Sequence, residues 1–428
     1  MIERPYWWDT VGSEQFARPQ SSHSDEQARV DVLVVGGGYT GLAAARRLAT
    51  SGASVLVLDR EAIGWGASSR NGGQVLTGLK LDPATLVGRY GEARARQLFD
   101  AGNDAIAQLE TVIHDERIAC GFERRGHVQA AWKASHFDAL RAEQSLLARV
   151  FNHRVDLVSR DRQRSEVGTD AYFGALVDEQ SAALNPAQYV TGLAAAARRA
   201  GACVRGGVAV ERIRRDGQRW IVDTSAESVS ARDILIATNG YTGAVAPEVH
   251  RQFVPIGSYI IATRPLDEAD ARAILPNGRV AYDSKNFLYY FRLTADRRLL
   301  FGGRAEFTPP SPASTRRAAD TLRRGMTTIF PQLRGVEIEY AWGGNVAFTR
   351  DQMPHAGQLG GLYFSGGYCG HGIAPATRLG DLIARRMAGE AIHDPLLESA
   401  CPAVPLYRGW PWFLPLAGAY FKVKDWIS

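Results

Sequence analysis

The sequence predicts an α/β fold of the Rossmann type, combined with a second, α+β part built on an antiparallel sheet. The first prediction rests on a β-α-β pattern of about 30 residues at 31–58. A short apolar run is followed there by glycines, a helical stretch of small residues and a second apolar run, as in buried parallel strands joined by a helix. The second rests on strand-like stretches at 256–264, 288–294 and 298–303.

The other elements follow from the same periodicities. Helices are expected at 92–113, 136–151, 188–200, 315–330 and 375–387, and further strands at 204–213, 219–224, 228–238 and 362–365.

The composition places the chain among globular proteins. Of its 428 residues, 45% are hydrophobic and 22% are charged, which excludes a disordered chain, a collagen and a disulfide scaffold. The net charge of +5 is small and the basic residues form only short pairs such as Arg214-Arg215, so no nucleic-acid partner is expected. None of the four cysteines has CxxC spacing, so no metal site is expected.

The two ends of the chain differ from the rest. Residues 1–24 are predicted as an irregular N-terminal arm without an apolar signal region, and the sequence has no stretch of 18 apolar residues. We therefore expect a cytoplasmic protein with no membrane span. Residues 396–428 form an aromatic tail whose prolines break any long helix, so we expect it to pack on its own protein or on a partner subunit, with a membrane-surface helix as the alternative.

A glycine motif follows the first predicted strand. Gly36, Gly38 and Gly41 form GxGxxG, which opens the predicted helix, and Asp59 ends the next strand. This context is the dinucleotide-binding fingerprint. The glycines allow a tight turn and close approach of the pyrophosphate, the helix N-terminus offers N–H groups to phosphates, and Asp59 offers acceptors to ribose hydroxyls.

Two further glycine clusters favour FAD over NAD as the dinucleotide. The cluster at 64–74 has small side chains that suit a loop lying along a large planar cofactor. The cluster at 366–372 precedes the last predicted helix. The N-terminus of that helix would stabilise the negative charge of a reduced isoalloxazine.

The stretches at 31–52, 64–74 and 366–384 resemble the D-amino-acid-oxidase superfamily of FAD-dependent amine oxidoreductases, and most closely its gamma-glutamylputrescine-oxidase-like branch. That branch carries similar GASGRNGG and W-G-x-x-x-x-T-x-D-x-x-P motifs, the second of which matches 342–354. The resemblance spans roughly 28–392. It implies a Rossmann-like FAD-binding domain of the glutathione-reductase type at 25–80, 170–255 and 345–395, and an antiparallel-sheet substrate domain at 81–169 and 256–344.

The resemblance also implies which residues contact a non-covalently bound FAD. Carried over by motif, they are Gly36, Gly38, Tyr39, Thr40, Gly41, Asp59, Arg60, Gly66, Ala67, Ser68, Arg70, Asn71, Gly72, Gly73, Gln74, Val210, Ala237, Thr238, Gly240, Gly367, Gly370, His371, Gly372 and Ile373.

The chain departs from the family where relatives hold a substrate carboxylate. The Arg of the G-x-R-P motif in D-amino-acid and glycine oxidases is absent from 343–346, and the Lys of sarcosine oxidases is matched by Ala374. The Cys that tethers flavin in sarcosine oxidases is also absent, near Gly344. These departures disfavour a simple α-amino acid substrate, although Arg292 or Arg70 could supply the missing contact.

The implied reaction is oxidation of a primary or secondary amine to an imine by hydride transfer to flavin N5, with O2 as the expected acceptor and H2O2 as product. His371 is expected to act beside the flavin and Lys285 to assist O2 reduction. The expected substrate-binding residues are Arg70, Tyr259, Tyr289, Arg292, Asn345 and Tyr368.

Two alternatives remain open. One is an oxidase or dehydrogenase of N-substituted glycines, such as iminodiacetate, sarcosine or opines. The other is a flavoprotein subunit acting with a protein or tRNA partner. The exact amine, the electron acceptor and the oligomeric state are left undetermined.

Overall fold

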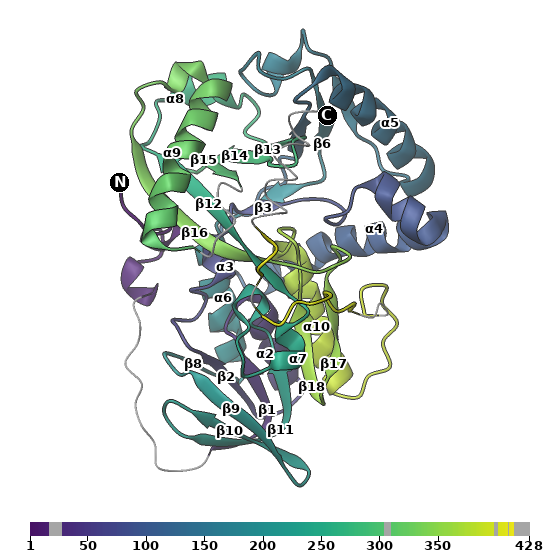
Figure 1. Ribbon diagram of the computed structural model, residues 1–428, viewed down its shortest axis with the longest axis vertical. Helices are drawn as coiled ribbons and strands as arrows, with labels where there is room; N and C mark the ends of the chain where they lie inside the picture. The colour runs from purple at the N-terminus through teal and green to yellow at the C-terminus, as the bar shows by residue number, and fades with distance from the viewer. Residues whose placement is uncertain (17–27, 304–309, 398–400, 410, 415–428) are drawn as a thin grey trace.

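The computed structural model describes residues 1–16, 28–303, 310–397, 401–409 and 411–414, and places two large sheets one above the other along its long axis (Figure 1). Short elements join or flank these sheets. They are α1 (Tyr6–Asp9), η1 (Ser13–Phe16), α3 (Ala67–Arg70), β3 (Gln74–Val75), η2 (Gln163–Ser165), β7 (Ala182–Ala183), η3 (Asn239–Tyr241), α7 (Pro247–His250) and η4 (Pro331–Leu333).

The first sheet, in the lower half of Figure 1, contains the predicted β-α-β unit. β1 (Ala28–Val35) pairs in parallel with β2 (Val55–Asp59) and with β11 (Ser228–Ile236), and α2 (Tyr39–Thr50) connects the first two strands. Alternate residues of β1 enter two different apolar clusters, one beneath the helices and one on the opposite face. The sheet order is β17-β18-β11-β1-β2-β8; β10 pairs with β11, and β9 pairs with β10. The other elements are α6 (Pro186–Arg199), β8 (Cys203–Gly206), β9 (Val210–Asp216), β10 (Arg219–Thr224), β17 (His355–Leu359), β18 (Leu362–Gly366) and α10 (Ile373–Met387).

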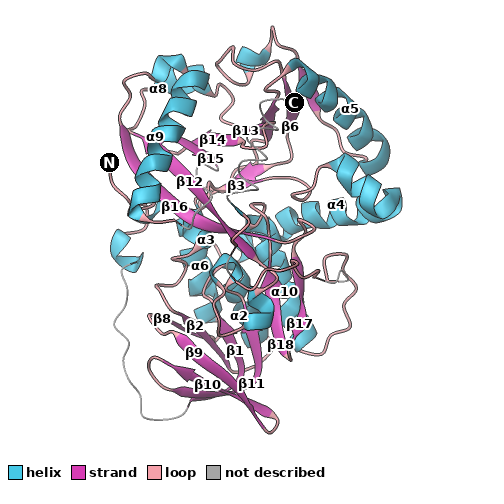
Figure 2. Cartoon of the chain, viewed as in Figure 1, coloured by secondary structure: helices cyan, strands magenta, loops and turns pink. Residues whose placement is uncertain are grey.

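The second sheet, in the upper half, is antiparallel except where β13 meets β4. Its two longest strands, β12 (Val254–Thr263) and β16 (Ile338–Phe348), pair with each other and descend toward the first sheet. Figure 2 shows helices over one face of this sheet. The order is β16-β12-β15-β14-β13-β4-β6-β5, and the remaining elements are β4 (His127–Ala130), β5 (Asp156–Val158), β6 (Ala175–Asp178), α8 (Glu268–Ile274), β13 (Val280–Asp283), β14 (Tyr289–Leu293), β15 (Leu299–Gly303) and α9 (Pro312–Ile329).

The structure differs from the sequence-based boundaries at several places, among them α4 (Pro83–Asp115) and β6. The first long helix, α4, consists of two helical stretches separated by Gly91, which has a non-helical φ of +74°. The second stretch starts at the expected residue 92, while the first, capped by Asp82, was not expected. β6 was expected in the FAD-binding part, whose second segment was placed from residue 170, but it pairs with β4 and β5 in the second sheet. α5 (Ala134–Phe151) packs beside α4 and β6.

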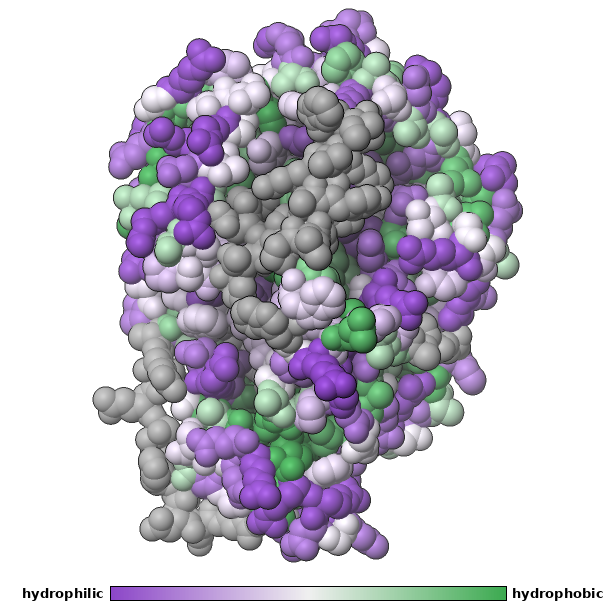
Figure 3. Space-filling view, in the orientation of Figure 1, coloured by the Kyte–Doolittle hydropathy of each residue, from purple (hydrophilic) through white to green (hydrophobic). Residues whose placement is uncertain are grey.

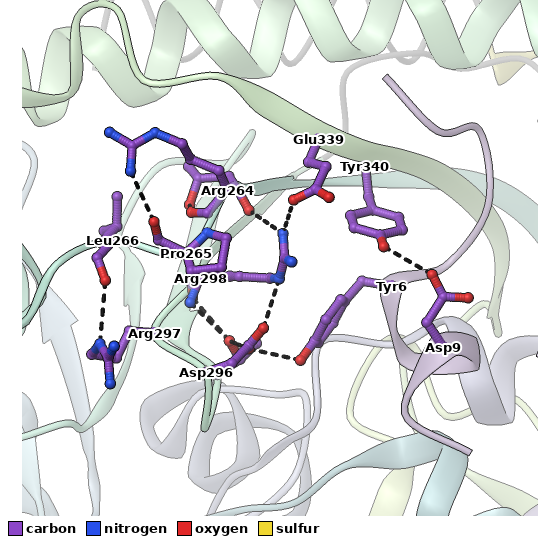
Figure 4. Close-up of polar contacts among 12 residues, drawn as sticks. Tyr6, Asp9, Arg264, Pro265, Leu266, Asp296, Arg297, Arg298, Glu339 and Tyr340 are labelled. Carbon is purple, nitrogen blue, oxygen red and sulfur yellow. Dashed lines mark hydrogen bonds and ion pairs between the residues drawn. The ribbon is translucent and has the colours of Figure 1, made fainter. Parts of the chain in front are cut away.

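The N-terminal arm is packed into the protein from its first residues. Tyr6 donates to Asp296 at 2.7 Å, and Arg298 donates to the other carboxylate oxygen of Asp296 at 2.8 Å (Figure 4). Tyr340 on β16 donates to Asp9 at 2.8 Å. The arm, expected to be irregular, is therefore fastened to the second sheet.

The tail is described only in part. Tyr407 and Leu414 form an apolar cluster with Val254 of β12, while residues 415–428 lie outside the described part of the chain. On the face shown in Figure 3, polar side chains surround an apolar patch that lies over the first sheet. Within the described ranges, no helix is long and apolar enough to span a bilayer.

Candidate functional site

A cavity of about 850 Å³ lies between the two sheets. Its lower wall consists of the loops that follow β1, β2 and β18, and its upper wall of side chains from α4, α5, β4, β6 and β13. We call these walls the cofactor side and the substrate side.

The turn after β1 depends on glycines that leave little room for a side chain. Gly36 has φ +111°, and a Cβ on Gly41 would lie 2.0 Å from the Gly36 carbonyl oxygen. This contact brings the start of α2 against the end of β1, so that the first turn of the helix faces the cavity. Asp59 is held beside it, because its carboxylate accepts from the N–H groups of Gly37 at 2.8 Å and Glu61 at 2.9 Å.

The second glycine loop, residues 64–74, is held in its conformation by hydrogen bonds of Asn71. The Asn71 amide donates to the Ala67 carbonyl oxygen at 3.0 Å, and its Oδ1 accepts from Gly73 N–H at 2.9 Å. Ser68 Oγ accepts from Tyr39 N–H at 3.0 Å, which ties this loop to the start of α2.

The third glycine loop, residues 366–372, forms another part of the cofactor side. Tyr368 shares a hydrogen bond of 2.6 Å with Thr40 on α2, and Gly367 N–H donates to Asn239 Oδ1 at 2.9 Å. α10 begins directly after this loop, at Ile373. Three glycine loops far apart in the sequence thus meet at one wall.

Two buried polar atoms on this wall have no hydrogen-bond partner within the described residues. They are Nε2 of His371 and Oδ1 of Asn345. Burial and the nearby Lys80 and His127 lower the pKa of His371 to about 3, so its imidazole is neutral at pH 7. Because buried polar groups are normally paired, these atoms indicate contacts with a ligand, and together with the glycine loops they fit a bound dinucleotide and its substrate.

Arg70 brings a positive charge to the same wall. Its guanidinium donates to the carbonyl oxygens of Trp65 at 2.8 Å and Gly343 at 3.1 Å, and stacks 4.0 Å from the Trp65 ring centroid. Burial lowers the pKa of Arg70. No carboxylate within the described ranges pairs with it, so its remaining donors are left for a ligand.

Lys285 lies on the substrate side with its charge already paired. Its Nζ is 2.9 Å from Asp283 Oδ2 and 3.9 Å from the Tyr289 ring centroid. Burial raises the pKa of Asp283 to about 6, although Lys285 opposes that shift. The pair therefore places little net charge in the cavity.

A buried network on the substrate side was not anticipated from the sequence. His153 Nε2 lies 2.6 Å from Asp178 Oδ2, which also accepts from Thr77 Oγ1 at 2.6 Å. The ring of His127 stacks on Tyr282 at 5.4 Å. Burial raises the pKa of Asp178, but His153, His127 and Thr77 together lower it to about 2. These residues come from separate segments without a spacing motif, so no pattern pointed to them.

Glu143 is a second feature that sequence analysis missed. It lies on α5, lines the cavity, and makes no ion pair or hydrogen bond with any other described residue. Burial, with Asp82 on the same wall, raises the pKa of Glu143 to about 7. It is thus a half-buried carboxylate that faces the cavity.

Most of the expected site residues line the cavity. They are Gly36, Gly38, Tyr39, Thr40, Asp59, Arg60, Gly66, Ala67, Ser68, Arg70, Asn71, Gly72, Gln74, Val210, Ala237, Thr238, Lys285, Asn345, Tyr368, Gly370, His371, Gly372 and Ile373.

The other expected residues lie behind the wall. Arg292 donates to the carbonyl oxygens of Gly73 at 2.8 Å and Leu184 at 2.9 Å, and Tyr259 donates to Ser314 at 2.9 Å. The structure thus places Arg292, Tyr259 and Tyr289, which were expected to touch substrate, outside the cavity wall. Arg292 supports the second glycine loop, and the two tyrosines pack within the second sheet and its helix. Gly41, Gly73, Gly240 and Gly367 also lie behind the wall.

No metal centre is evident in the described part of the chain, where no group of three or more His, Cys, Asp and Glu side chains could hold an ion.

Comparison with known proteins gives one family and several relatives. The family described as DAO, FAD dependent oxidoreductase, matches residues 31–386. Gamma-glutamylputrescine oxidoreductase of Escherichia coli is 33% identical over 406 residues, covering 94% of both chains. A probable oxidoreductase of Haemophilus influenzae is 31% identical over 400 residues, covering 90% of this chain and 88% of the relative.

Solved structures share the fold at lower identity. Glycine oxidase from Geobacillus kaustophilus has a TM-score of 0.73 at 20% identity, covering 89% of this chain and 99% of that one. Iminodiacetate oxidase from Chelativorans has a TM-score of 0.66 at 19% identity, covering 89% and 98%.

Proposed function

Because this chain belongs to the DAO family of FAD-dependent oxidoreductases, we propose that it oxidises the C–N bond of a primary or secondary amine to an imine. The observation that carries the proposal is the neutral, buried His371, whose unpaired Nε2 lies on the cavity wall beside the third glycine loop. A neutral imidazole nitrogen can accept an N–H from an uncharged amine and orient it.

When bound, FAD would supply the redox chemistry, as the acceptor of a hydride from the carbon next to nitrogen. The protein binds the cofactor through the three glycine loops, orients the amine and excludes water. We propose that the hydride and one N–H proton end on O2 as H2O2, so that amine and O2 become imine and H2O2. Lys285 remains a candidate to assist this last step, since it lines the cavity.

The protonation state of the amine is the main energetic obstacle. An alkylamine has a pKa of about 10.4, so making it neutral at pH 7 costs about 4.6 kcal/mol in water. Burial in the cavity lowers that pKa, because desolvation disfavours the charged form. An amine that binds uncharged needs no strong base in the site.

The test is anaerobic reduction of the bound flavin with a panel of amines and amino acids. We expect amines to bleach the yellow absorbance, and H2O2 to form in stoichiometric amount in air. H371N should lower kcat/KM for the amine by about 10- to 100-fold with bound FAD unchanged, whereas H114N, on the surface of α4, should change neither. Failure of every amine to reduce the flavin would contradict the proposal.

A second candidate is oxidation of N-substituted glycines, favoured by Arg70. Its guanidinium lines the cavity without a carboxylate partner in the described ranges and could bind a substrate carboxylate. In that case reduction would require a carboxylate on the substrate, and R70M would abolish the preference for iminodiacetate over its uncharged analogue.

We propose that FAD is bound without a covalent bond. Cys369 lines the cavity, but burial raises the pKa of its thiol and Sγ donates to the Gly367 carbonyl oxygen at 3.2 Å. A protonated thiol is a poor nucleophile. Acid precipitation should therefore release all the flavin into solution, and flavin retained in the pellet would contradict this.

A further inference from the structure

We infer that Glu143, assisted by Asp82, binds a second cationic group of the substrate at the end of the cavity away from FAD. The inference rests on the proposed amine oxidation and names its substrate class: an aliphatic amine that carries another positively charged nitrogen several methylene groups away. Three observations support it: Glu143 lines the cavity, it has no partner among the described residues, and apolar side chains line the wall around it.

Glu143 is aimed at the cavity by its position on α5. Glu143 and Leu147 are one turn apart on this helix, and both line the cavity. Asp82 reaches the same wall from the start of α4, where its carboxylate caps the helix by accepting from Thr85 N–H at 2.8 Å. Two carboxylates from different helices thus face one volume.

The protein itself does not neutralise Glu143. Other carboxylates on this wall have partners, such as Asp178 with His153 and Asp283 with Lys285. Glu143 has none within the described residues. The pKa of about 7 expresses the cost of burying this charge, and an ammonium group from a ligand would offset that cost.

The cavity also provides a second acceptor. Nε2 of His371 is buried without a partner in the described part of the chain and lines the same cavity. The stacked rings of His127 and Tyr282 line the same cavity, and His127 lowers the pKa of His371 while Glu143 raises that of Tyr282. Lys80 also lines the cavity, and its charge lowers the pKa of His371.

Apolar parts of the cavity wall suit a chain of methylene groups. Apolar side chains from five segments line it, and these are Leu79, Phe99, Leu147, Val155 and Leu176. A linear diamine would place its reacting nitrogen at His371, its methylenes along these side chains and its second ammonium at Glu143. A monoamine of equal length would leave Glu143 unpaired.

The experiment compares 1,4-diaminobutane with n-butylamine on the FAD-loaded full chain. In the wild type we expect the diamine to bind at least 10-fold more tightly by calorimetry and to reduce flavin at lower concentration. E143Q should weaken diamine binding by 10- to 100-fold and raise KM with kcat nearly unchanged, while leaving n-butylamine unaffected. E143D, which keeps the charge, should recover part of the preference.

A matched control and a second readout separate the possible failures. E337Q removes an exposed carboxylate outside the cavity and should behave as wild type. If neither amine reduces the flavin, the proposed function fails, yet calorimetry with 1,4-diaminobutane still tests Glu143. Equal diamine binding by wild type and folded E143Q, or equal losses for both amines, would overturn the inference.

Discussion

The two sides of the cavity are built by different means. The cofactor side depends mainly on backbone: three glycine loops bring main-chain groups together, as where Gly41 packs on the Gly36 carbonyl oxygen. The substrate side is made of side chains, among them Glu143, His153 and Asp178. A site made of backbone requires particular residues at fixed spacing, whereas a site made of side chains requires only that the fold bring them together.

The largest expected effect is a loss of FAD affinity, caused by disturbing a backbone contact on the cofactor side. G41A would place a methyl group 2.0 Å from the Gly36 carbonyl oxygen, and neither backbone segment can move without disturbing the turn. We expect FAD affinity to fall at least 100-fold, or about 3 kcal/mol. The measurement is the FAD dissociation constant from flavin fluorescence.

The matched control is G88A, in the first turns of α4. A Cβ there meets nothing within 4 Å, so we expect unchanged FAD binding and a gain of up to about 1 kcal/mol from helix propensity. Equal FAD affinity for both variants would show that the close contact is not required.

The next largest effect is a loss of stability, caused by removing one partner of a side-chain pair on the substrate side. D178N removes the charge that pairs with His153 and accepts from Thr77. Because one partner of a buried pair is lost, we expect the free energy of unfolding to fall by about 3 kcal/mol in urea denaturation. D156N, at an exposed position on neighbouring β5, should have almost no effect.

The pH dependence of unfolding gives a second test of how Asp178 contributes to stability. The pKa of Asp178 is lowered in the folded protein, from 3.8 to about 2. Its contribution of about 2 kcal/mol is therefore complete above about pH 5 and is lost as the pH falls toward 2. The stability difference between wild type and D178N should shrink by about 1 kcal/mol between pH 6 and pH 3, and a constant difference would contradict this assignment.

The smallest expected effect tests the arm that supports the cofactor side. Trp8 Nε1 donates to Ser69 Oγ at 2.9 Å, and its ring stacks on Phe16 at 4.9 Å. W8F keeps the stacking but loses the hydrogen bond, so we expect a loss of about 1 kcal/mol in thermal or urea unfolding. W412F, at a half-exposed position in the tail, should change stability by less than half of that.

The contrast explains how much could be predicted from the sequence. The fold class, the family and FAD are confirmed, since the β-α-β pattern and the glycine motifs leave local signals. Arg292 was expected to touch substrate, but its strand position did not indicate that its guanidinium turns to the Gly73 carbonyl oxygen. Glu143 gave no signal at all, because a glutamate on an amphipathic helix is typical of a solvated face.

The fastened N-terminal arm has a consequence for the order in which the protein assembles. Ile2 N–H donates to the Glu339 carbonyl oxygen at 2.7 Å, and Trp7 donates to the Asn71 carbonyl oxygen at 2.9 Å. The two segments that meet here, at Ile2 and Tyr340, are separated by more than three-quarters of the sequence. Long-range closure of this kind is a late folding event. We therefore expect the support that the arm gives to the second glycine loop to form late in folding.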